Sequence, residues 1–317
     1  MKVAVTGASG FVGGPVCARL IEARHAVRAV VRTAPLAAGV TQAELHANCD
    51  LEDEASWDRV VAGVDAVVHL AARAHVMHDD PATSDALYRR ANVHVTQGLA
   101  EAAVRHGVKR FVYMSSIKVN GERTGERPFT PQDVPAPEDA YGRSKWAAEE
   151  ALMRIAAGRM ETVIVRPPLL YGPHMRGNMR RLFQLVQLGV PLPFASIRNA
   201  RDLLYVGTLA DLVAALVQHP RAAGRVFLAR DGAALSTPAL IAAIATSLGR
   251  STLCIPCPPG TIRFGAKLVG AADMAARLLD DLRIDDAATR GDLGWSPTLS
   301  FPDALAETAR WFKSRAS

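Results

Sequence analysis

The stretch Thr6-Gly7-Ala8-Ser9-Gly10-Phe11-Val12-Gly13 decides the fold of this 317-residue chain. It follows the apolar run 2–6 and precedes the alanine-rich run 15–23, which has the pattern of a helix. A glycine-rich turn between a strand and a helix lets the backbone approach a phosphate group, and the helix N-terminus adds amide donors and positive partial charge. The stretch therefore predicts a dinucleotide-binding turn at the start of a βαβ unit.

The three glycines of this turn have different tasks. Gly7 allows the tight turn, Gly10 lets the backbone come close to a pyrophosphate, and Gly13 permits close packing of the helix. The residues expected to contact the dinucleotide here are Gly7, Ser9, Gly10, Phe11, Val12 and Gly13.

Short apolar runs and helical patterns alternate through the first half of the chain. The further expected strands are 27–31, 65–70, 110–114 and 161–166, and the clearest helical patterns are 92–106 and 141–157. Such alternation is typical of an α/β fold with a doubly wound parallel sheet and helices on both faces.

After Arg166 the pattern changes, because prolines interrupt it repeatedly. We therefore expect residues 1–166 to form the dinucleotide-binding domain, with late elements from about 200–230 returning to it. Residues 167–317 are expected to form mainly a smaller, mostly helical substrate-binding lobe.

Composition excludes several classes of protein. The chain is 49% hydrophobic and 21% charged, and no apolar stretch is long enough to cross a bilayer. The chain begins directly in an apolar strand without room for a signal peptide, so we expect a soluble, cytoplasmic protein without a membrane partner. The four cysteines are Cys17, Cys49, Cys254 and Cys257. They are too scattered for a disulfide framework, and the single Cys-x-x-Cys lacks a second ligand pair, so we expect no metal site.

The net charge of +6 comes from basic residues spread along the chain rather than from a basic block. This distribution argues against nucleic-acid binding. A mild positive excess suits a small, doubly anionic ligand instead.

Residues near the ends of the next strands predict how the nucleotide is held. Arg32, with Arg28 close by, stands where an acidic residue would hold a free ribose 2′-hydroxyl. A guanidinium pairs with a 2′-phosphate, so the sequence favours NADP over NAD, although NAD stays possible. Asp50 is placed to accept a hydrogen bond from the adenine amino group.

Tyr141 and Lys145 are four residues apart in the second helical pattern. This spacing puts both side chains on one face of a helix, one turn apart. An ammonium beside a phenol favours the phenolate and would lower its pKa toward the range useful for proton transfer.

Four motifs together resemble the extended short-chain dehydrogenases/reductases. These are the glycine-rich turn, His69-Leu70-Ala71-Ala72, Met114-Ser115-Ser116 and Tyr141-x-x-x-Lys145. The likeness runs over nearly the whole chain and is strongest to the nucleotide-sugar epimerase and reductase branch, the NAD-dependent epimerase/dehydratase family. It implies a Rossmann fold and an NAD(P)-dependent oxidoreductase.

The resemblance also implies catalytic roles. Tyr141 would exchange a proton with a sugar hydroxyl or keto oxygen, Ser116 would hydrogen-bond the same oxygen, and Lys145 would bind the nicotinamide ribose. Asn92 matches the active-site asparagine of the family. Hydride would pass between C4 of a nucleoside-diphosphate sugar and the nicotinamide.

Further binding residues follow from the same resemblance. Additional cofactor contacts are expected from Leu51, Leu70, Ala71, Ala72, Ser115, Lys145 and Pro168. Arg201 would meet the nucleotide diphosphate, with Asn178 and Arg277 as further substrate contacts beside Ser116 and Tyr141. A homodimer and a role in polysaccharide biosynthesis are implied as well.

Several reactions remain open. Ile117 and Lys118 follow Ser116 where dehydratases carry an acidic pair, which disfavours dehydration. Thr208 and Leu169 depart from the pattern of UDP-galactose epimerases. A 4-epimerase and a 4-keto-sugar reductase both remain open, and Arg32 favours reduction because an epimerase usually retains NAD. The alternatives outside this class are an NADPH-dependent reductase of a flavonoid- or steroid-like ketone and a non-catalytic NADP-sensing regulator.

Overall fold

The computed structural model describes residues 1–33, 40, 42–74, 81–268, 270 and 272–315. Within these residues the main sheet has strands β1 (Lys2–Thr6), β2 (Ala26–Val30), β3 (Glu44–His46), β4 (Ala66–His69), β5 (Arg110–Met114), β6 (Glu161–Val165) and β9 (Arg225–Phe227). They pair in parallel in the order β3-β2-β1-β4-β5-β6-β9. The predicted doubly wound parallel sheet is confirmed.

The order of the strands reverses at β1, which lies between β2 and β4. In open α/β sheets, ligands bind in the crevice beyond the carboxyl ends of the strands at such a reversal. The glycine-rich turn leaves β1 at its carboxyl end, so the topology puts this turn at the expected crevice.

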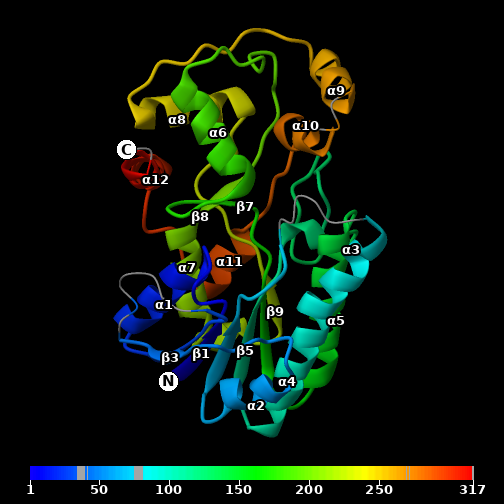
Figure 1. Cartoon of the computed structure of the whole chain (residues 1–317), viewed down its shortest axis with the longest axis vertical. Coiled ribbons are helices and arrows are strands. Elements are labelled where there is room, and N and C mark those ends of the chain that lie inside the picture. The colour runs from blue at the N-terminus through cyan, green and yellow to red at the C-terminus, as the bar shows by residue number, and fades with distance from the viewer. Residues whose placement is uncertain (34–39, 41, 75–80, 269, 271, 316–317) are drawn as a thin grey trace.

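Helices cover both faces of the sheet (Figure 1). One face packs against α1 (Gly13–Glu22), α7 (Val206–Leu216) and α11 (Ala287–Leu293). The other face packs against α2 (Ala55–Val61), α4 (Val95–Arg105) and α5 (Ala140–Ala156).

The strands are buried on both sides, which explains why they read as continuous apolar runs. In β1, Val3 and Val5 join the core beneath α1, whereas Ala4 joins the core beneath α2. All three are fully buried. Each buried methylene contributes about 0.8 kcal/mol, so a slip of this strand by one residue would exchange the two faces at high cost.

The second lobe is mostly helical and lies beyond the carboxyl ends of the main strands (Figure 1). A small parallel sheet, β7 (Leu169–Tyr171) and β8 (Leu203–Tyr205), forms its base. Its helices are α6 (Gly177–Leu188), α8 (Thr237–Leu248), α9 (Pro259–Leu268), α10 (Ala272–Leu279) and α12 (Phe301–Ser314). Tyr171, Phe183, Ile241 and Phe312 belong to one core there.

Late elements return to the main sheet. Strand β9 pairs with β6, and α7 packs on the same face as α1. Helix α11 also packs there through Leu293, which the proposed boundaries of 167–317 place in the other lobe. The assignment of cofactor to one lobe and substrate to the other stays a prediction.

Two local features differ from the sequence reading. Strand β3 was not expected, since it has only three residues and its side chains are largely exposed. The helical pattern over 92–106 begins earlier, because α3 (Pro81–Tyr88) runs through a π-helix (Arg89–His94) into α4. In the part of the chain that the structure describes, no helix combines the length and apolar character needed to cross a bilayer.

Candidate active site

At two positions of the glycine-rich turn, Gly7 and Gly13, the surrounding backbone leaves no room for a side chain. Gly7 has a φ of +69°, and a Cβ at this position would lie 2.9 Å from the backbone nitrogen of Ala71. A Cβ at Gly13 would lie 2.1 Å from the carbonyl oxygen of Gly7. Backbone therefore packs directly on backbone, and the turn keeps the close approach that a pyrophosphate requires.

The Thr6 hydroxyl joins the ends of β1 and β4. Its Oγ1 lies 2.7 Å from Nδ1 of His69 and accepts hydrogen bonds from the backbone nitrogens of Leu70 at 3.2 Å and Ala71 at 3.3 Å. Burial, with the nearby charge of Lys145, lowers the pKa of His69 to about 3, so the imidazole is neutral. The predicted cofactor residues Leu70 and Ala71 are thereby held beside the glycine-rich turn.

The predicted cofactor residues of the turn and the β4 end differ in exposure. Ser9, Gly10 and Ala72 are exposed, whereas Phe11, Val12, Leu70 and Ala71 are half-buried. An exposed, glycine-lined turn fits the pyrophosphate of a dinucleotide.

At the end of the site where the adenosine is predicted to bind, Arg28 and Arg32 differ in exposure. Arg32 is exposed just beyond β2. Arg28 is 7% exposed, and its guanidinium donates to Glu44 and to three backbone carbonyls. Arg28 therefore serves the framework and is not available for a 2′-phosphate.

The other two adenine-side predictions lie on the loop after β3. Asp50 is exposed, and its carboxylate accepts a hydrogen bond from the backbone nitrogen of Glu52 at 3.0 Å. Leu51 is half-buried, and its carbonyl accepts from the Trp57 indole at 2.9 Å. Both stay predictions as cofactor contacts.

Helix α5 presents Tyr141 and Lys145 one turn apart, as the spacing predicted. The helix begins after Asp139, whose carboxylate accepts a hydrogen bond from the backbone nitrogen of Gly142 at 2.6 Å. A charged N-cap fixes the first turn and complements the positive end of the helix. The position of Tyr141 is thus set by the residue two places before it.

Ser116 and Tyr141 meet. Ser116 follows β5 in an extended conformation and caps the short 3₁₀ helix Ile117–Val119, with its Oγ accepting from the backbone nitrogen of Lys118 at 3.3 Å. Tyr141 forms a hydrogen bond with Ser116, and this hydrogen bond lowers the pKa of the Tyr141 phenol.

The pKa of Tyr141 is nevertheless raised. Burial is the main cause, and the negative charge of Asp139 adds to it. The spacing argument expected the opposite direction, so it is corrected here: in this structure the phenol is protonated, as a proton donor would be.

Lys145 is 1% exposed, and burial lowers its pKa to about 7, with the charge of Glu149 opposing the shift. Its Nζ lies 4.0 Å from the centre of the Tyr113 ring. Near neutral pH the amine therefore populates both protonation states.

Asn92 lies on the π-helix and is 1% exposed. Its amide oxygen accepts from the backbone nitrogen of Arg73 at 2.8 Å. Its amide nitrogen donates to the Arg73 carbonyl at 3.1 Å and to Ser144 Oγ at 2.9 Å. A π-helix often marks a functional site. Asn92 ties the loop after β4 to α5, and its catalytic role stays a prediction.

A buried ion pair lies next to α5, and the sequence analysis did not predict it. Glu149 and Arg166 are joined at 2.6 Å, with side chains 0% and 3% exposed. Ser115 donates its hydroxyl to Glu149, and Arg166 donates to Asn120 at 3.0 Å. Because the Ser115 hydroxyl already donates to Glu149, a hydrogen bond from this hydroxyl to a cofactor would have to replace the one to Glu149.

Pro168 is buried just after β6. The carbonyl of its neighbour Pro167 accepts from the backbone nitrogen of Ile117 at 3.0 Å. The exit of β6 is therefore joined to the turn that carries Ser116.

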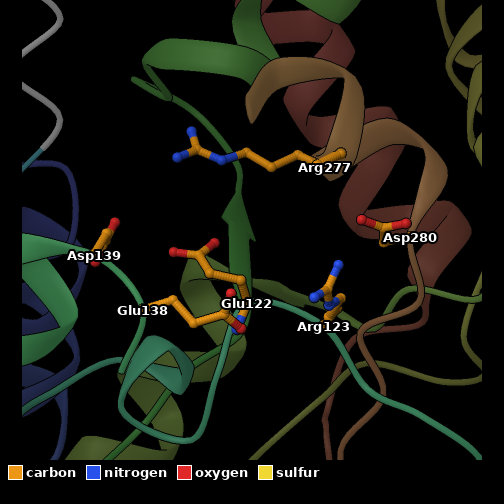
Figure 2. A pocket seen from close by; sticks show the side chains of 7 residues that line it. Glu122, Arg123, Glu138, Asp139, Arg277 and Asp280 are labelled. Carbon is orange, nitrogen blue, oxygen red and sulfur yellow. The ribbon is translucent and has the colours of Figure 1, made fainter. Parts of the chain in front are cut away.

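A cavity of about 340 Å³ lies where the two lobes meet, next to the start of α5 (Figure 2). It is lined by Glu122, Arg123, Glu138, Asp139, Ala276, Arg277 and Asp280. Its distant segments are joined by backbone hydrogen bonds from Thr124 to Asp281 at 2.9 Å and from Phe129 to Arg283 at 2.8 Å.

Of the three further substrate contacts implied by the resemblance, Arg277 lies in the lining of this cavity, and Arg201 lies near it without being among the lining residues. Arg277 lines the cavity, and its charge is felt by Arg201, whose pKa is lowered mainly by burial. Arg201 donates to the carbonyl of Asp280 at 2.8 Å. Two neighbouring guanidiniums suit a diphosphate. Asn178 is half-buried in the first turn of α6 and is not among the residues lining the cavity.

Known proteins resemble this chain along its length. The model of the NAD dependent epimerase/dehydratase family matches residues 3–229. The chain is 38% identical over 315 residues to UDP-glucose 4-epimerase of Vibrio cholerae, covering 98% of this chain and 95% of the relative.

Two solved structures share the fold. They are the UDP-glucose 4-epimerase of Thermotoga maritima with UDP-glucose and the UDP-glucuronic acid 4-epimerase of Bacillus cereus in complex with NAD. Each has a TM-score of 0.79 and 22% identity, with 100% of both chains covered. The chain therefore belongs to the NAD dependent epimerase/dehydratase family, whose members are extended short-chain dehydrogenase/reductase enzymes.

Proposed function

We propose that the protein transfers hydride at C4 of a nucleoside-diphosphate sugar and works as an NAD(P)-dependent 4-epimerase. The observation that carries this proposal is the contact between Ser116 and Tyr141, with buried Lys145 one turn further along α5. These residues lie beyond the carboxyl ends of the strands, at the same end as the glycine-rich turn.

The chain's own residues divide the work. Tyr141 Oη gives a proton to the C4 oxygen of the sugar or takes it back, and Ser116 holds that oxygen by a hydrogen bond. Lys145, with its pKa lowered to about 7, accepts or gives up a proton near neutral pH, and in this proposal it binds the ribose hydroxyls of the nicotinamide nucleotide. The nicotinamide dinucleotide, for which the glycine-rich turn has the right shape, supplies the hydride chemistry.

The full-length similarity to a UDP-glucose 4-epimerase favours epimerisation. Net reduction of a 4-keto sugar by NADPH is the second candidate, since Arg32 is exposed at the end of β2. The paired guanidiniums of Arg201 and Arg277 favour a substrate with a diphosphate over a flavonoid- or steroid-like ketone. The Ser116–Tyr141 contact favours an enzyme over an NADP-sensing regulator.

The reaction is tested with purified protein and UDP-sugars, with and without added NADPH. Conversion of UDP-glucose to UDP-galactose without net change in nicotinamide absorbance is expected of an epimerase. Stoichiometric loss of NADPH with a UDP-4-keto sugar would identify the reductase instead.

Tyr141→Phe should lower kcat by about 10²- to 10⁴-fold, because it removes the proton donor. The matched control is Tyr88→Phe, since the Tyr88 ring lies 6.1 Å from that of Tyr141. Full activity of Tyr141→Phe would overturn the assignment.

Cofactor choice is tested at Arg32. Arg32→Asp should weaken NADPH binding by about tenfold and leave NADH binding unchanged if the guanidinium holds a 2′-phosphate. The predicted homodimer and the role in polysaccharide biosynthesis remain part of this proposal, and light scattering of the purified protein tests the former.

A further inference from the structure

The cavity beside Tyr141 is divided by charge. Figure 2 shows Glu122, Glu138 and Asp139 gathered at one side, with Arg277 extending over them from α10. We call these three acidic side chains the carboxylate wall. Arg123 and Arg277 supply the guanidiniums of the cavity, and Arg201 stands behind them.

The carboxylate wall is only partly neutralised. Lys118 Nζ binds both Glu122 and Asp139. Within the described residues, no cation pairs with Glu138, whose carboxylate accepts only a long hydrogen bond of 3.4 Å from the backbone nitrogen of Glu122. Three carboxylates thus share one ammonium.

The fourth carboxylate of the cavity is different. Asp280 forms an ion pair with Arg263, so its charge is locally compensated. The guanidiniums of the cavity stay available for an anion, because in the described chain neither Arg123 nor Arg277 has a carboxylate within ion-pair distance. A bound diphosphate would neutralise these guanidiniums and leave the excess charge on the carboxylate wall.

The carboxylate wall is also close to the reacting groups. Asp139 caps α5 two residues before Tyr141, and Lys118 follows two residues after Ser116. If C4 of a sugar lies at Ser116 and Tyr141, its C6 group lies close by, because C6 is attached to C5, the direct neighbour of C4. In a sugar that binds with its C5 side toward Asp139, the C6 group faces this wall.

We infer that the carboxylate wall makes the enzyme selective for nucleoside-diphosphate hexoses with an uncharged C6 group and against nucleoside-diphosphate uronic acids. This selectivity presupposes the proposed function, since that function places C4 at Tyr141. Sugar hydroxyls donate charge-assisted hydrogen bonds to carboxylates, whereas a C6 carboxylate meets charges of its own sign. The chain would then differ in substrate from the UDP-glucuronic acid 4-epimerase that shares its fold.

The expected discrimination is large enough to measure. Two like charges roughly 6 Å apart, at an effective dielectric constant of about 20, repel strongly enough for about a 100-fold difference in binding. Salt screens such repulsion, so the difference should shrink as ionic strength rises.

The test compares UDP-glucose with UDP-glucuronic acid, which differ only at C6. The protein is supplied with NAD⁺, and both kcat/KM and the Kd of each nucleotide sugar are measured. We expect UDP-glucose to be favoured about 100-fold in kcat/KM and in Kd, and Glu138→Gln to reduce this preference about tenfold. Glu138 is exposed and has no cation partner among the described residues, so the variant should fold normally.

Asp280→Asn is the matched control, because Asp280 lines the same cavity but is paired with Arg263. It should leave the preference between the two substrates unchanged. Equal use of UDP-glucuronic acid and UDP-glucose, or an unchanged preference in Glu138→Gln, would overturn the selectivity while the proposed reaction stands. If neither nucleotide sugar binds or reacts, both proposals are wrong.

Discussion

The glycine-rich turn and the charged cavity are built in opposite ways. The turn is made of consecutive residues, and backbone contacts such as that between Gly13 and Gly7 give it its shape. The cavity is assembled from side chains of segments far apart in sequence, such as Glu122 and Arg277. A site made of consecutive backbone atoms tolerates few substitutions, because an added side chain distorts its shape. A site made of side chains can change its charge by substitution with little effect on the fold.

The largest effect is expected outside both regions, at the buried ion pair between Glu149 and Arg166. Arg166→Ala leaves Glu149 buried and unpaired, so the free energy of unfolding should fall by about 3–5 kcal/mol. Chemical denaturation checks this value. The double variant Glu149→Leu/Arg166→Met should recover much of the lost free energy of unfolding. A loss below about 1 kcal/mol in Arg166→Ala would mean that the ion pair contributes little to stability.

The turn should be the next most sensitive region. Gly13→Ala forces a Cβ into the Gly7 carbonyl, so it should lower the free energy of unfolding by about 1–3 kcal/mol and abolish detectable dinucleotide binding by calorimetry. The control is Gly265→Ala in α9, where a Cβ meets nothing within 4 Å. Normal dinucleotide affinity in Gly13→Ala would show that the turn is more plastic than its geometry indicates.

The pH dependence of stability tests the buried amine. The pKa of Lys145 is about 7 in the folded protein and 10.5 ordinarily, so between these values the unfolded chain binds the extra proton. The stability of the wild type relative to Lys145→Met should therefore rise with pH above about 7, by about 1.4 kcal/mol per pH unit. Denaturation series of both proteins measure this difference, and a flat difference would place the amine in a wetter environment.

The smallest expected effect is at Lys118, which binds two acidic residues of the cavity lining. Lys118 binds Glu122 and Asp139, so Lys118→Met should loosen the contact between Ser116 and Tyr141 and lower kcat about tenfold. Thermal unfolding should change little, because the pairs are partly exposed. Lys109→Met, on the loop before β5, is the control. A large drop in melting temperature with unchanged kcat would show that Lys118 stabilises the fold and has no effect on catalysis.

The sequence predicted what is local and missed what depends on tertiary placement. The glycine-rich turn, the strands β1, β2, β4, β5 and β6, and the Tyr141–Lys145 spacing follow from neighbouring residues, so they were predictable. Glu149 is only four residues beyond Lys145 on α5, yet its importance comes from Arg166, which directly follows strand β6. The raised pKa of Tyr141 depends on burial, which spacing does not report.

The substrate side shows the same limit. Arg277 was expected only through family resemblance and does line the cavity, whereas Asn178, expected on the same grounds, does not. No short motif links Glu122 to Glu138, because their proximity depends on how the loop before α5 folds back.

The π-helix at Arg89–His94 lets one continuous helix face two different partners. An α-helix turns about 100° per residue, so an extra residue in one turn changes the direction of everything that follows. Before it, Tyr88 packs against Tyr141; after it, Leu99 packs into the core beneath the sheet. The wider π-helical turn thus lets Tyr88, the neighbour of Tyr141, and Leu99, a core residue, each face its own partner from one continuous helix.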